Sequence, residues 1–165
     1  TLFRSCPNHT ALSDPFFVAF AFQKKNPLRV MAKIQLMRVP VIGWLLGKAG
    51  IFGVDRGHAD MHAAKTALRC LKEGHKLLIF PEGTRVEEGE NVDAKAGAAM
   101  FATRTGVPIV PMYIPAQKHW FRPTTVVIGE PYYPQIQGRR ATAEENQEIA
   151  REIMRRIHAL GGLPQ

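Results

Sequence analysis

Short apolar runs alternate along the chain with longer stretches in which apolar residues recur every three or four positions. The short runs predict strands near residues 1 to 6, 28 to 33, 50 to 54, 76 to 80, 107 to 113 and 125 to 130. The longer stretches predict helices from Ala59 to Glu73, over residues 96 to 105, and from Ala143 to Leu160. A further helix is predicted from Pro15 to about Gln23, because Asp14 can cap it and Pro15 fits its first turn. This alternation predicts an α/β fold with a mostly parallel central sheet flanked by helices.

Two of the predicted helices carry clear internal signals. The helix that starts at Ala59 has Met61, Ala64, Leu68 and Leu71 at helical spacing, and Gly74 follows it as a left-handed terminator. The last helix has isoleucine and leucine on one face and arginine and glutamate on the other. Both patterns are typical of helices that bury one side against a sheet.

One apolar run has no such periodicity. Residues 39 to 52 are apolar apart from Lys48. The run is too short to cross a bilayer, so it is either buried core or a surface that meets lipid, and the pattern leaves both open.

Length and charge narrow the class of protein. A chain of 165 residues is the size of one domain, and 22 Lys and Arg against 14 Asp and Glu give a net charge of +8. Such a surplus attracts anions.

The cysteines, Cys6 and Cys70, form no C-x-x-C pair, so neither a disulfide framework nor a zinc site is indicated. Because the chain opens inside an apolar run without a methionine, we expect an upstream segment, such as an anchor, to be missing.

Residues 7 to 14, here called the histidine loop, hold His9 and Asp14 five positions apart, at the start of a predicted helix. Histidine is well suited to remove a proton from an alcohol near neutral pH, and a carboxylate on its other nitrogen would fix the tautomer. A plainer interpretation is equally open: Asp14 caps the helix that Pro15 begins, and His9 is a polar loop residue.

Residues 80 to 85, here called the glutamate turn, have the sequence Phe-Pro-Glu-Gly-Thr-Arg. The turn follows a mostly apolar strand, and open α/β sheets bind ligands at the carboxyl ends of their strands. There the Arg85 guanidinium suits a phosphate, and Gly83 permits a tight turn. The alternative is that Glu82 pairs with a nearby cation while Arg85 is solvated.

Together, these segments resemble the motifs of the glycerolipid acyltransferases, specifically the lysophosphatidic acid acyltransferase family. Asn8-His9 with Asp14 resembles the first motif, residues 50 to 56 the second, the glutamate turn the third and residues 107 to 111 the fourth. The four occur in family order. The resemblance implies a glycerol-3-phosphate acyltransferase-like fold and a single acyltransferase domain over residues 1 to 165.

The resemblance also implies a role for individual residues. His9 would be the general base and Asp14 its partner. The acceptor phosphate would be held by Arg56, Arg85 and Lys33.

The same family implies that Asn8, Glu82, Gly83 and Thr84 bind the acceptor or shape its site, and that residues 107 to 111 line the acyl side. Gly53 departs from the family, which more often has a bulkier apolar residue there, so we expect a change in pocket shape.

The expected function is transfer of a fatty acyl group from acyl-CoA or acyl carrier protein to the sn-2 hydroxyl of 1-acylglycerol 3-phosphate, giving phosphatidic acid for phospholipid biosynthesis. Alternatives are a related enzyme acting on another lysophospholipid or on glycerol 3-phosphate, and an inactive membrane-binding relative. A thioesterase-like use of Cys6 with His9 and Asp14 is a weaker alternative.

This chemistry needs no cofactor and no metal, because the thioester is already activated. We expect a lysophospholipid acceptor, a membrane surface and no nucleic acid as partners, since no basic and aromatic residues are interleaved. The expected location is the cytoplasmic face of the cell membrane, either peripheral or anchored by a segment outside this chain.

Overall fold

The computed structural model describes residues 4–11, 13–15, 17–18, 28–48, 50–54, 61–84, 94–117 and 124–162. At a few positions within helices and strands, Lys33 among them, only the backbone is described.

The core of the protein is one six-stranded sheet with the strand order β3-β2-β4-β1-β5-β6. Its strands are β1 (Arg4–Pro7), β2 (Leu28–Lys33), β3 (Ile51–Val54), β4 (Lys76–Leu78), β5 (Ile109–Tyr113) and β6 (Val127–Ile128). All neighbouring pairs are parallel except β5 and β6, which are antiparallel. Each predicted strand is present, and the predicted mostly parallel α/β fold is confirmed.

Both faces of the sheet are covered. Leu77 and Ile79 point into the larger apolar core, whereas the alternate residues Leu78 and Phe80 point into a second core on the other face. A strand buried on both sides reads as a continuous apolar run rather than as an alternating one. This is why residues 76 to 80 were recognisable as a central strand.

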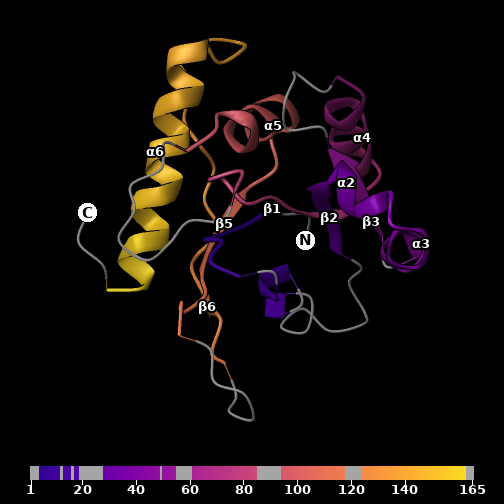
Figure 1. The fold of residues 1–165 in the computed structure, drawn as a ribbon. Coiled ribbons are helices and arrows are strands. Elements are labelled where there is room, and N and C mark those ends of the chain that lie inside the picture. Colours follow the sequence, from indigo (N-terminus) through magenta and orange to yellow (C-terminus); the bar gives the residue numbers. More distant parts are fainter. Residues whose placement is uncertain are drawn as a thin grey trace.

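Three helices contribute to the larger core: α4 (Met61–Lys72), α5 (Gly97–Thr105) and α6 (Ala143–Leu160). Figure 1 shows α5 and α6 close together on the same side of the sheet, with the turn around residues 14 to 18 on the opposite side. These helices fall where the sequence predicted them, and α6 is held at its start by a capping box between Thr142 and Glu145. Only part of the helix predicted from Pro15 is described, and residues 14, 15, 17 and 18 in it are helical.

The buried stripe of α4 differs from the one that its larger apolar residues suggest. Ala63, Ala67, Cys70 and Leu71 are the buried residues, whereas Met61 is 64% exposed. Small side chains let the helix axis approach the sheet closely, so the contact runs along the alanines. Counting large apolar residues alone therefore placed the stripe partly on the wrong side.

Two helices between β2 and β3 were not predicted: α2 (Ile34–Met37) and α3 (Pro40–Lys48). The apolar run of residues 39 to 52 is thus divided between α3 and the edge strand β3. The turn between the helices is tight, since a Cβ on Gly43 would collide with the Met37 carbonyl oxygen. No helix in the described parts of the chain is both long enough and apolar enough to cross a bilayer.

Gly53, at a position where the resemblance implies a bulkier apolar residue, lies in β3 against α2. A Cβ at this position would meet the Cα and Cγ1 of Ile34, each at 3.1 Å. The glycine therefore allows α2 to pack directly onto the edge strand, and a bulkier side chain would push that helix outward.

Candidate active site

The histidine loop and the glutamate turn meet at the carboxyl edge of the sheet. β1 and β4 are parallel neighbours, so their carboxyl ends lie side by side. His9 comes two residues after the end of β1, and Glu82 comes four residues after the end of β4. The sheet thereby joins two segments that are far apart in the sequence.

His9 and Asp14 form a buried pair. The Nδ1 atom of His9 lies 3.1 Å from Oδ2 of Asp14, whose side chain is fully buried. A carboxylate on Nδ1 favours the tautomer with the proton on that nitrogen, which leaves Nε2 as the basic atom. The predicted pairing of these residues is therefore present in the geometry.

The same carboxylate oxygen also holds the loop. Asp14 Oδ2 accepts hydrogen bonds from the backbone N–H groups of Thr10 at 2.8 Å and Ala11 at 2.7 Å. These bonds go to residues that precede Asp14, so they hold the histidine loop, and the predicted capping of the helix that Pro15 begins stays a prediction. By fixing the loop that carries His9, the aspartate sets both the position and the orientation of the imidazole.

Two contacts connect His9 to the glutamate turn. The imidazole stacks on the ring of Phe80, with ring centroids 4.1 Å apart and an interplanar angle of 27°. The backbone N–H of His9 donates to Oε2 of Glu82 at 2.8 Å. The first contact limits rotation of the ring, and the second positions the backbone from which it extends.

Glu82 is itself buried, and its charge is disfavoured. Burial raises the pKa of its carboxyl to about 7, with the negative charge of Asp14 adding to the rise and the hydrogen bond from His9 opposing it. Among the described residues Glu82 has no ion pair, so the alternative in which it pairs with a nearby cation finds no support there. Near neutral pH the carboxyl is therefore partly protonated.

Asn8 makes hydrogen bonds with the backbone of the strand beside it. Its side-chain amide donates to the carbonyl of Ile114 at 2.8 Å and accepts from the N–H of Ile114 at 2.7 Å. Asn8 therefore connects the end of β1 to the residue just beyond β5. Its two hydrogen bonds resemble the backbone pairing between neighbouring strands. Its predicted role at the acceptor site would be indirect, through the placement of His9.

Gly83 and Thr84 complete the described part of the turn. Gly83 has φ +69°, a left-handed conformation that other residues rarely adopt, and Thr84 is exposed. A Cβ on Gly83 would come within 2.7 Å of the Lys95 side chain and 3.3 Å of its Nζ. Lys95 is thus a cation beside the turn that sequence reasoning missed, since it lies in a loop distant from every motif.

Three cations are predicted to hold the acceptor phosphate. Arg56 and Arg85 lie outside the described residues, and Lys33 is described by its backbone alone, as the last residue of β2. That position is at the same edge of the sheet as His9, because β2 is parallel to β4. The roles assigned to these three cations stay predictions.

The fourth motif and Cys6 both contribute to the core. Val107, Ile109 and Val110 are buried in the two apolar cores, so a contact with an acyl chain stays a prediction. Cys6 is fully buried in the larger core, where it lacks the access that a nucleophile requires. No cluster among the described residues offers three His, Cys, Asp or Glu side chains to a metal ion.

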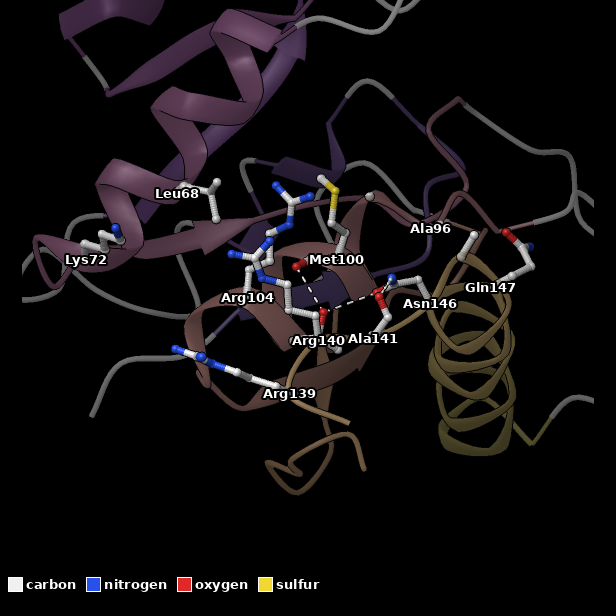
Figure 2. A pocket seen from close by; sticks show the side chains of 13 residues that line it. Leu68, Lys72, Ala96, Met100, Arg104, Arg139, Arg140, Ala141, Asn146 and Gln147 are labelled. Atoms are coloured by element: carbon white, nitrogen blue, oxygen red, sulfur yellow. Dashed lines mark hydrogen bonds between the residues drawn. The ribbon is translucent and has the colours of Figure 1, made fainter. Parts of the chain in front are cut away.

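A separate pocket of about 920 Å³ lies between α4, α5 and the start of α6 (Figure 2). None of the residues of the histidine loop or the glutamate turn lines it. The charged residues that line it are all basic: Lys72 from α4, Arg104 from α5 and the loop residues Arg139 and Arg140.

A buried histidine–carboxylate pair at the carboxyl edge of a parallel sheet defines a class of α/β enzymes equipped for general-base chemistry. The chain belongs to the acyltransferase family, whose family model matches residues 5–115. The resemblance seen in the four motifs is thereby confirmed. The expectation of one domain over residues 1 to 165 is not tested by this match.

Individual relatives agree with this assignment. A 1-acyl-sn-glycerol-3-phosphate acyltransferase from Pseudomonas aeruginosa is 33% identical over 150 residues, covering 84% of this chain and 57% of that protein. One from Borreliella burgdorferi is 32% identical, covering 69% of this chain and 46% of that protein. The crystal structure of the 1-acyl-sn-glycerophosphate acyltransferase PlsC from Thermotoga maritima aligns with a TM-score of 0.69 at 26% identity, over 99% of this chain and 68% of that one. The chain thus spans about half the length of these two curated relatives.

Proposed function

We propose that this chain carries the active site of a 1-acylglycerol-3-phosphate acyltransferase. The observation that supports this most directly is the buried His9–Asp14 pair, whose loop is hydrogen-bonded to Glu82. The names of the relatives from Pseudomonas aeruginosa and Borreliella burgdorferi support the substrate class.

In the proposed reaction, Nε2 of His9 removes the proton from the free hydroxyl of the acceptor. The hydroxyl oxygen then attacks the thioester carbonyl carbon and forms a C–O bond. The C–S bond breaks, and the thiolate that leaves takes up the proton from His9. Asp14 stabilises the imidazolium that exists between these two proton transfers, because its carboxylate lies 3.1 Å from Nδ1.

The finer substrate assignments are also proposals. The donor is acyl-CoA or acylated carrier protein, the acceptor hydroxyl is at sn-2 and the product is phosphatidic acid. Arg56, Arg85 and Lys33 hold the acceptor phosphate. The site of action is the cytoplasmic face of the cell membrane, reached peripherally or through a segment outside this chain.

A direct test is release of free thiol from oleoyl-CoA by the purified protein, with and without 1-oleoylglycerol 3-phosphate. Thiol release that requires the acceptor, and that falls at least about 10²-fold in His9→Ala, would support the proposal. Replacing His158 of α6 by alanine provides a control for loss of a histidine elsewhere. Release without acceptor would indicate a hydrolase, and full activity in His9→Ala would exclude His9 as the base.

The acceptor alternatives separate in the same assay. Substituting glycerol 3-phosphate or another lysophospholipid for 1-oleoylglycerol 3-phosphate identifies the acceptor by which one supports acyl transfer. An inactive membrane-binding relative would release no thiol with any of them.

A further inference from the structure

Helix α3 exposes apolar side chains that a water-facing helix would not carry. Val41 is 76% exposed, Trp44 is 61% exposed and Val39, just before the helix, is 42% exposed. Lys48 at the end is the only charged residue of α3. A helix that is apolar on nearly all sides is normally buried, so this face is expected to be covered by a partner.

The position of α3 relates it to the active site. α2 begins directly after the last residue of β2, and α3 follows α2 after two residues. The start of α3 therefore lies toward the same edge of the sheet as His9, at the margin formed by β3. Figure 1 shows α3 at the outer side of β3, away from α5 and α6.

Along the sequence, the charges on and beside α3 have a single sign. No aspartate or glutamate occurs between Asp14 and Asp55, and that segment contains six lysines and arginines. Two of these are exposed: Arg38, which lies two residues before α3, and Lys48, the last residue of α3. The Nζ of Lys48 lies 4.5 Å from the centroid of the Trp44 ring.

We propose that α3 docks this protein onto anionic phospholipid bilayers. Val41 and Trp44 enter the headgroup region, and Arg38 and Lys48 contact lipid phosphates. Tryptophan beside lysine and arginine on an apolar helix is the composition of a helix that lies in a membrane interface. The inference rests on the proposed function, because a lysophospholipid acceptor and its product reside in such a bilayer.

A second copy of the chain is a poorer occupant of this face. A symmetric dimer through α3 would bring the same surface of both copies together, so the positive charges of one copy would approach those of the other. Like charges across an interface are unfavourable. An anionic bilayer instead complements them.

The test uses Trp44 as its own probe. With Trp120→Phe, Trp44 is the only remaining tryptophan. Vesicles with 30% phosphatidylglycerol are expected to shift its fluorescence to the blue and to bind the protein, whereas pure phosphatidylcholine vesicles bind at least about tenfold more weakly.

Matched variants locate the surface. Trp44→Glu removes the fluorescent probe, so it is made in the parent chain and followed by sedimentation alone, and it is expected to lose vesicle sedimentation by at least about tenfold. Tyr133→Glu is the control, since Tyr133 is also 61% exposed but lies beyond β6. Circular dichroism melting checks that both variants fold. Equal sedimentation of the two variants would overturn the proposal, as would self-association that depends on Trp44 without any vesicle binding.

Two further measurements separate this inference from the proposed function. His9→Ala is expected to sediment with vesicles like the parent chain, because docking does not use the base. Trp44→Glu is expected to lose activity on acceptor embedded in vesicles but to keep it on a short-chain acceptor in free solution. Equal loss on both acceptors would overturn docking as the role of α3.

The basic pocket of Figure 2 supports a second inference from independent observations. Lys72, Arg104, Arg139 and Arg140 line it from three segments of the chain, and no aspartate or glutamate lines it. None of the four has an ion pair with a described residue. Like charges gathered in a concave surface favour an anionic ligand.

The pocket also adjoins the glutamate turn. Ala96 and Gly97, at the start of α5, belong to its lining, and the preceding residue, Lys95, reaches Gly83 and donates its backbone N–H to Pro81. The floor includes the apolar side chains Leu68 and Met100. Cations around an apolar floor suit a phosphorylated nucleotide.

The geometry points to the nucleotide end of a CoA thioester as the ligand of this pocket, with the pantetheine arm extending past α5 toward His9. This also rests on the proposed function. A concave site of this size suits a small ligand, whereas a carrier protein would need a broader surface.

The probe is adenosine 3′,5′-bisphosphate, titrated by calorimetry. Arg104→Gln and Arg140→Gln are each expected to weaken binding about tenfold, the loss expected for one charge-assisted hydrogen bond. Arg151→Gln is the control, since that exposed arginine is paired with Glu148 on α6. Unchanged affinity in both pocket variants would overturn the inference, independently of whether acyl transfer occurs. Where transfer is measurable, KM for acyl-CoA is expected to rise while kcat and activity with acylated carrier protein are unchanged.

Discussion

Oε2 of Glu82 accepts a hydrogen bond from the backbone N–H of His9, across 73 positions of sequence. The contact is made to the main chain, so it positions the imidazole without competing for either ring nitrogen. Glu82 thus acts by positioning His9. Because the Glu82 carboxyl is buried, its ionisation makes the stability of the protein depend on pH.

Glu82→Gln is expected to remove part of the pH dependence of stability. The folded-state pKa of Glu82 is raised to about 7 from an ordinary value of 4.5. Its stabilising contribution is complete below pH 4.5 and is lost as pH rises through 7, because the unfolded chain ionises this group first. The free energy of unfolding of the parent chain should therefore fall, relative to Glu82→Gln, by a few kcal/mol between pH 4.5 and pH 8.

The measurement is urea unfolding of both proteins at a series of pH values. Comparing the pair cancels the titration of all other groups. Glutamine retains a carbonyl oxygen that can accept from His9, so the hydrogen bond itself is kept. Parallel curves for the two proteins would contradict the raised pKa.

Asp14→Asn is expected to separate folding from chemistry. An asparagine oxygen can still accept from the N–H groups of Thr10 and Ala11, so the loop is largely retained. It cannot stabilise an imidazolium as a carboxylate does, and kcat should fall by about 10²- to 10⁴-fold. Steady-state kinetics with a thermal melt of the same sample measures both effects. If Asp14→Asn were largely unfolded at the assay temperature, the loss of structure would account for the loss of activity. That result would indicate that Asp14 serves the loop alone.

Asn8→Leu is expected to destabilise the protein by about 2 to 4 kcal/mol, because the N–H and C=O of Ile114 lose their partners in a buried place. Asn8→Asp should cost less, since it keeps the acceptor for the Ile114 N–H. Chemical denaturation ranks the three proteins. If Asn8→Leu were as stable as the parent chain, the amide would have no role in holding β1 to the end of β5.

Gly83→Ala is expected to cost about 1 to 2 kcal/mol of stability, because φ is +69° and the new methyl group meets Lys95. The double variant with Lys95→Ala relieves the contact but not the backbone strain. Thermal melts of the single and double variants separate the two causes. Complete recovery in the double variant would show that the backbone conformation carries no cost.

Much of this arrangement was visible in the sequence. All six strands were predicted, since parallel strands buried on both faces read as short apolar runs bounded by turn residues. The closeness of His9 and Asp14 followed from their spacing in one loop. The helices α2 and α3 were missed for a related reason: a helix without a polar face gives no periodic signal.

The sequence by itself determined the local features, namely strand positions, helix ends at Gly74 and Gly106, and the motifs that identify the family. These depend on residues near one another in the chain. Only the tertiary structure decided that Glu82 holds the backbone of His9, that Asn8 is bonded to Ile114, and that Trp44 faces outward. Each of those depends on which strands become neighbours, and burial or exposure of a side chain is settled by segments that pack against it from far along the chain.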